Sequence, residues 1–65
     1  MQIVCNGERR DTLARNVAEL LAELRLAERP VAVEINREVT PRAQHADRVL
    51  QEGDCIEIVT LVGGG

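Results

Sequence analysis

The chain of 65 residues contains no phenylalanine, tyrosine or tryptophan, and all eight of its basic residues are arginine. A core built from this sequence must therefore consist of Leu, Ile, Val and Ala side chains. The net charge is −3 at pH 7. Proteins that bind nucleic acid neutralise phosphates with a basic surface and often stack bases on aromatic rings. Because this chain has neither feature, we do not expect it to bind nucleic acid.

Metal-binding motifs and long apolar runs are missing as well. The two cysteines, Cys5 and Cys55, do not form a CxxC pair, and His45 is the single histidine. We therefore expect no metal site, and we place His45 on the surface. No apolar stretch approaches the roughly 20 residues that a membrane span needs. A strand-like run starts at Met1, so we expect no signal peptide, a cytoplasmic location and free thiols.

The length of the chain limits what it can do alone. A domain of this size buries only about 60% of the surface that its unfolded chain exposes. No room remains for a deep cavity or a catalytic cleft of several residues. We therefore expect a protein that is not an enzyme and holds no bound cofactor.

Alternating apolar residues predict the strands. Residues 1–5 form a short β-branched run, and Asn6-Gly7 after it is a strong hairpin signal. Residues 31–35 alternate apolar and other side chains, which predicts a strand with one buried face. Residues 55–62 are the longest strand candidate. We also predict a polar edge strand at 8–11 and a short returning strand at 38–39 after a turn at 36–37. An irregular polar loop at 41–47 and a second turn at 51–54 complete the prediction.

One helix is predicted between the first hairpin and the middle strand. Val17, Leu20, Leu21 and Leu24 recur at the spacing of a single helical face, which predicts a helix over 17–25. Asn16 is a good N-cap, and Glu19 three residues later gives a start that resembles a capping box.

The order of these elements predicts an α+β fold. One helix with a leucine stripe must cover one face of a sheet. The first and last strands can lie side by side in parallel, because a long crossover separates them. This is the order of the β-grasp (ubiquitin-like) fold, with a mixed sheet of four to five strands. The alternation places Cys5 and Cys55 on opposite faces, so we expect no disulfide between them.

Three glycines, Gly63, Gly64 and Gly65, follow the last strand candidate. Glycine allows a close approach of backbone to another surface, because it has no Cβ. We therefore expect a folded body over residues 1–62 and a flexible tail over 63–65, able to carry a carboxylate into a narrow slot of another protein.

Several segments together resemble the bacterial sulfur carrier proteins of thiamine thiazole biosynthesis, the ThiS family. The resemblance covers the whole chain and depends on the order and spacing of its segments, since none is specific alone. Asn16 and His45 depart from the residues usual in the family. The segments are Met1-Gln2-Ile3 with Asn6-Gly7, Val17 to Leu21, Val33 to Asn36, Val39 to Arg42, Leu50 to Asp54, Ile56 to Ile58, and Val62 to Gly65.

The resemblance implies a function for the tail. In the family, a ThiF-type enzyme uses ATP and Mg to adenylate the terminal carboxylate, which here is that of Gly65. A sulfur donor such as a cysteine desulfurase then replaces AMP, and the resulting thiocarboxylate passes its sulfur to thiazole synthase. Gly64 and Gly63 would thread the active sites of the partners. The free carrier is expected to be a monomer.

Two other functions remain open on the sequence. One is the small subunit of molybdopterin synthase or another thiocarboxylate donor. The other is a β-grasp interaction module without chemistry at its C-terminus. On the predicted outer face of the last strand, Val59 and Leu61 lie close to the tail. We expect these two residues, together with Val62, to contact partner proteins.

Overall fold

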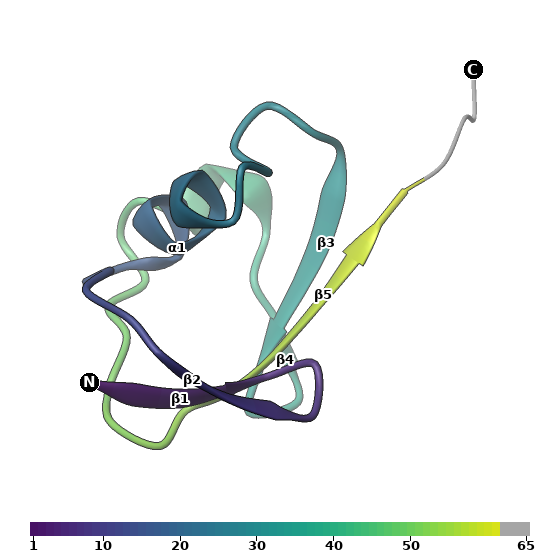
Figure 1. The fold of residues 1–65 in the computed structure, drawn as a ribbon. Helices are drawn as coiled ribbons and strands as arrows, with labels where there is room; N and C mark the ends of the chain where they lie inside the picture. Colours follow the sequence, from purple (N-terminus) through teal and green to yellow (C-terminus); the bar gives the residue numbers. More distant parts are fainter. Residues whose placement is uncertain (62–65) are drawn as a thin grey trace.

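In the part of the chain that the structure describes, five strands form one sheet, and a single α-helix lies across one of its faces (Figure 1). The structure is a computed structural model in which residues 1–61 are described. The elements in chain order are β1 (Gln2–Cys5), β2 (Glu8–Asp11), α1 (Val17–Glu23), β3 (Val31–Ile35), β4 (Glu38–Val39), a 3₁₀ turn (Arg42–Gln44) and β5 (Cys55–Thr60).

The sheet is mixed, as predicted. Its strand order is β2-β1-β5-β3-β4, so the last strand along the chain occupies the middle. β1 and β5 pair in parallel, with Val4 opposite Cys55, whereas the other strand pairs are antiparallel. β2 lies at one edge, which confirms the expectation of a polar edge strand over 8–11.

The core lies between α1 and the inner face of the sheet. Alternation along the strands points one set of apolar side chains toward the helix, which contributes Val17, Leu20 and Leu21. β3 and β5 therefore each have one buried and one exposed face, as their sequences predicted. The strand residues of the core are Ile3, Val33, Ile35, Ile56 and Ile58.

The helix begins where predicted and ends earlier. The Asn16 side chain accepts a hydrogen bond from the Glu19 amide at 2.8 Å, which confirms the N-cap. The predicted end at residue 25 is wrong, because Arg25 adopts a left-handed conformation with φ of 62°. The amides of Arg25 and Leu26 donate to the carbonyls of Ala22 and Leu21, which is the Schellman arrangement that closes a helix.

Two hairpins share one turn geometry. Asn6 and Gly7 have φ values of 50° and 83°, and Asn36 and Arg37 have 50° and 72°. Both central residues of each turn are left-handed, as a two-residue type I′ turn requires. The second turn thus holds an arginine in a conformation that favours glycine.

His45 is buried, which corrects the prediction of a surface histidine. Only 6% of its surface is exposed, and its Nε2 lies 2.9 Å from the Thr40 carbonyl oxygen. A carbonyl can only accept, so Nε2 carries the proton and donates it. The ring is buried with this bond satisfied because the 3₁₀ turn at 42–44 folds the polar loop back toward α1, whose Ala18 amide donates to the His45 carbonyl.

Candidate functional site

The end of β5 holds the base of the predicted tail in place. The amide of Leu61 donates to the Pro30 carbonyl at 2.9 Å, and Thr60 lies opposite Val31 in the register of β3 and β5. In Figure 1 this end of β5 lies far from the N-terminus. The predicted functional residues Val62, Gly63, Gly64 and Gly65 lie outside the described residues.

Exposed apolar side chains lie beside the base of the tail. Val59 and Leu61 are 57% and 53% exposed, as their predicted outer face requires. Ala32 lies directly opposite Val59, and Val39 on the edge strand is 70% exposed. We call Ala32, Val39, Val59 and Leu61 the outer patch. A shallow hollow of about 280 Å³ lies against its first three members.

Two carboxylates adjoin the outer patch. Glu34 and Glu57 are exposed and lie directly opposite each other on β3 and β5. Like charges in this arrangement destabilise a sheet. Within residues 1–61 neither forms an ion pair, although Arg37 lines the same hollow. The face therefore combines apolar surface with unneutralised negative charge.

The two cysteines lie on opposite faces of the sheet, and both are free thiols, as predicted. Cys5 is half-buried beside the core, and burial raises the pKa of its thiol, with Glu57 and Glu8 adding to the rise and Arg10 opposing it. A raised pKa keeps the thiol protonated at neutral pH, which makes Cys5 a poor nucleophile. Cys55 is exposed at the start of β5.

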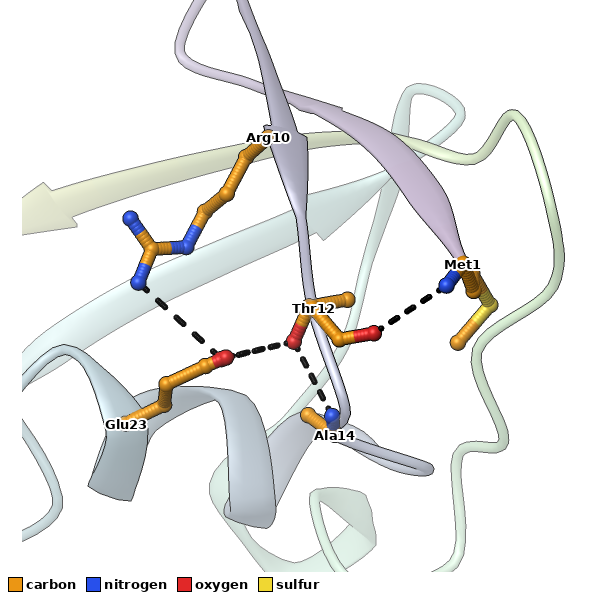
Figure 2. Close-up of polar contacts among 5 residues, drawn as sticks. All are labelled: Met1, Arg10, Thr12, Ala14 and Glu23. Atoms are coloured by element: carbon orange, nitrogen blue, oxygen red, sulfur yellow. Dashed lines mark hydrogen bonds and ion pairs between the residues drawn. The ribbon is translucent and has the colours of Figure 1, made fainter.

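The sequence did not point to a polar cluster that joins β2 to the end of α1 (Figure 2). The Thr12 hydroxyl donates to the Glu23 carboxylate, with 2.6 and 2.7 Å to its two oxygens, and accepts from the Ala14 amide at 3.0 Å. Arg10 lies 3.9 Å from the same carboxylate. A carboxylate in the last turn of a helix faces the negative end of the helix dipole, so these contacts compensate for its position.

Within residues 1–61, no group of three or more His, Cys, Asp or Glu side chains is arranged to hold a metal ion. No helix in this part of the chain is long and apolar enough to cross a membrane. The site beside the base of the predicted tail is the outer patch.

Comparison with known proteins decides the family. The model of the ThiS family matches residues 3–65, which include the outer patch and the terminal glycines. This chain belongs to the ThiS family. The sulfur carrier protein ThiS of Escherichia coli is 35% identical, and the alignment covers all of both chains. The ThiS of Thermus thermophilus is 37% identical over 92% of this chain and 94% of its own.

A solved structure supports the same fold. The crystal structure of the thiamine biosynthesis protein ThiS from Geobacter metallireducens matches all of this chain with a TM-score of 0.84 and 33% identity, and the match covers all of that chain too. The predicted β-grasp fold is therefore confirmed.

Proteins of another name also contain a similar region. A thiazole synthase from Paramagnetospirillum magneticum contains a region that aligns with the whole of this chain at 44% identity. A thiazole synthase from Magnetococcus marinus has the same identity over the same extent. This chain spans only 20% of the length of each of them.

Proposed function

We propose that this member of the ThiS family is a sulfur carrier in thiamine biosynthesis and serves its partner enzymes as a co-substrate, with no catalytic site of its own. The observation that carries the proposal is the family match, which continues through the three terminal glycines. The fold supports it, because β5 leads to these glycines directly from the centre of the sheet.

The proposed reacting group is the α-carboxylate of Gly65. A terminal carboxylate has an ordinary pKa of about 3.3–3.7, so it is ionised at neutral pH and is a poor electrophile. A ThiF-type enzyme would use ATP and Mg to join it to AMP with release of pyrophosphate. A sulfur donor would then displace AMP. Sulfide would leave a thiocarboxylate directly, whereas the persulfide of a cysteine desulfurase would form an acyl disulfide, from which a thiol reductant releases the thiocarboxylate by cleaving the S–S bond.

The body would serve as the docking surface for these enzymes. Residues 62–65 can span at most roughly 14 Å, since an extended chain reaches about 3.3–3.6 Å per residue. An enzyme that holds the carboxylate of Gly65 must therefore lie close to Leu61. The outer patch is the apolar surface found there, so we assign Val59 and Leu61, together with Val62, to the contact with partner enzymes.

Thiazole synthase is the proposed acceptor of the sulfur. Two proteins of that name contain a region similar to the whole of this chain. Where a carrier region and an enzyme form one polypeptide in some organisms, we expect a separate carrier in another organism to bind the corresponding separate enzyme.

The first experiment is the intact mass of the chain after incubation with an activating enzyme, Mg-ATP and sulfide. We expect sulfur in place of oxygen, and fragmentation should place it at Gly65. Fragmentation is needed because oxidation of Met1 changes the mass by nearly the same amount. An unmodified terminus, with an enzyme that modifies another carrier, would contradict the proposal and favour an interaction module.

A substitution pair tests the docking surface. Val59→Asp introduces a charge into the outer patch, and we expect it to weaken binding to the activating enzyme at least about tenfold, a loss of about 1.4 kcal/mol. Val49→Asp is the control, because Val49 is 59% exposed, close to the 57% of Val59, and lies outside the patch. Equal affinities of the two variants would show that the patch is not the contact surface.

A further inference from the structure

The outer edge of β2 has hydrogen-bonding groups without a strand partner in the described chain. In antiparallel strands, hydrogen-bonded and non-hydrogen-bonded pairs alternate. Met1 and Thr12 form a hydrogen-bonded pair, with the Thr12 amide 2.9 Å from the Met1 carbonyl oxygen. Because the two kinds of pair alternate along the register, Arg10 is also hydrogen-bonded to β1. Arg9 and Asp11 belong to the other kind and direct their N–H and C=O groups away from β1.

The charges on this edge follow the same alternation. The side chain of Arg10 turns toward α1 and lies 3.9 Å from Glu23 (Figure 2). Arg9 and Asp11 lie on the other face and are exposed. Within residues 1–61 neither forms an ion pair with another side chain. Arg9 and Asp11 therefore combine backbone groups that have no strand partner with side chains of opposite charge that form no ion pair in the described chain.

We propose that β2 pairs with β2 of a second copy of this chain, antiparallel and centred on Arg10. In this register Arg9 lies opposite Asp11 of the second copy, and Asp11 lies opposite Arg9. Each of these pairs can exchange both of its backbone hydrogen bonds. Each also brings opposite charges together on an exposed face, where cross-strand pairs stabilise a sheet.

Other registers fit less well. A shift by two residues in one direction places Arg9 opposite Arg9, and in the other direction it places Asp11 opposite Asp11. A shift by one residue places backbone N–H and C=O groups that already bond to β1 opposite the free groups of the second copy, so hydrogen bonds cannot form between them. The chosen register places Arg10 opposite Arg10 of the second copy, and this cost is reduced because Glu23 lies beside each guanidinium.

The contact would be weak and would not interfere with the tail. Stable interfaces bury about 1,200–2,000 Å² in total, and a strand of four residues offers less than that. We therefore expect a dimer that forms at micromolar to millimolar concentration. β1 separates β2 from β5, so the base of the tail stays free in both copies.

Sedimentation equilibrium over a range of concentrations tests the pairing. The average mass should rise above 7.2 kDa toward twice that value. Arg9→Asp places Asp opposite Asp, and Asp11→Arg places Arg opposite Arg, so each variant should dissociate about tenfold more readily or worse. An equimolar mixture of the two variants should recover association, because both cross-strand pairs then have opposite charges. The double variant R9D/D11R should recover it alone.

Amide hydrogen exchange gives a second readout. The amides of Arg9 and Asp11 should exchange more slowly at high concentration, whereas that of Arg10 should not change. A wild-type chain that stays at 7.2 kDa at millimolar concentration would overturn the proposal and leave the edge to a strand of another protein. Association that survives in each single variant would overturn it as well.

Discussion

The core between α1 and the sheet is built from aliphatic side chains, since the sequence has no aromatic residue. Leu21 is 4% exposed in this core. Leu21→Ala should lower the free energy of unfolding by about 2–5 kcal/mol, because it removes buried methyl groups and leaves a cavity. A domain of this size has roughly 3–5 kcal/mol in total, so the variant should be close to unfolding.

Urea unfolding of the variant and of a matched control measures this effect. Leu13→Ala removes the same atoms at a position that is 94% exposed, and we expect a change within about 0.5 kcal/mol. Similar losses in the two variants would mean that the buried face of the helix is assigned incorrectly.

Glu19 couples the start of the helix to pH. Its carboxylate accepts a hydrogen bond from the Arg15 amide at 2.8 Å, and this bond is the main reason that the pKa of Glu19 lies below its ordinary 4.5. A lowered pKa in the folded state gives stability that is present above pH 4.5 and is lost as the pH falls through the lowered value.

Glu19→Gln keeps an acceptor oxygen and removes the titration. Stability should therefore fall less steeply in the variant when urea unfolding is compared at pH values on either side of 4.5. Parallel curves for the two proteins would show that another group is responsible for the acid dependence.

Single residues also mark the limit of prediction from sequence. The cap at Asn16 and the exposure of Val59 were predicted correctly, because each depends on neighbours in the chain. The burial of His45 was not, because it depends on how the 42–44 turn folds back onto α1. The contacts of Glu23 with Thr12 and Arg10 join residues 11 or more positions apart, and no local pattern indicates them.

At the scale of elements, the strands were predicted better than their ends and edges. Period-two alternation identified β3 and β5, while the end of α1 depends on a left-handed arginine that no propensity favours. The proposed pairing of β2 could not be predicted from the sequence, because the free backbone groups of Arg9 and Asp11 can be recognised only once the register of β1 and β2 is known.

The two type I′ turns differ in their second central residue, which is Gly7 in one and Arg37 in the other, so exchanging these residues tests the cost of the left-handed conformation. Arg37→Gly should raise the free energy of unfolding by about 0.5–1 kcal/mol, because glycine removes the left-handed strain of roughly 1–2 kcal/mol and part of that gain is offset by backbone entropy. Gly7→Arg makes the reverse change in the other turn, where a Cβ would meet no atom within 4 Å. It should destabilise the fold by a similar amount in thermal unfolding. Loss of stability in Arg37→Gly would show that contacts of the arginine outweigh its strain.

For the whole molecule, the proposed function gives the described body and the terminal glycines separate tasks. If Gly64 must enter a slot that excludes a Cβ, Gly64→Ala should unfold at the same temperature as wild type and be adenylated far more slowly. Pyrophosphate release by the activating enzyme measures the second effect. Adenylation at the wild-type rate would show that the slot is wider than proposed.

The central place of β5 has a consequence for synthesis of the chain. β1 and β3 each pair with β5 and not with each other. A nascent chain that has emerged only to residue 54 therefore lacks the strand that joins its two hairpins, which are marginally stable alone. The sheet can form only when β5 leaves the ribosome. The glycines follow the same strand in the sequence. On the proposed function, a translation product that stops before β5 has neither a closed sheet nor the glycines that an activating enzyme would recognise. Incomplete carriers should therefore not compete with finished ones.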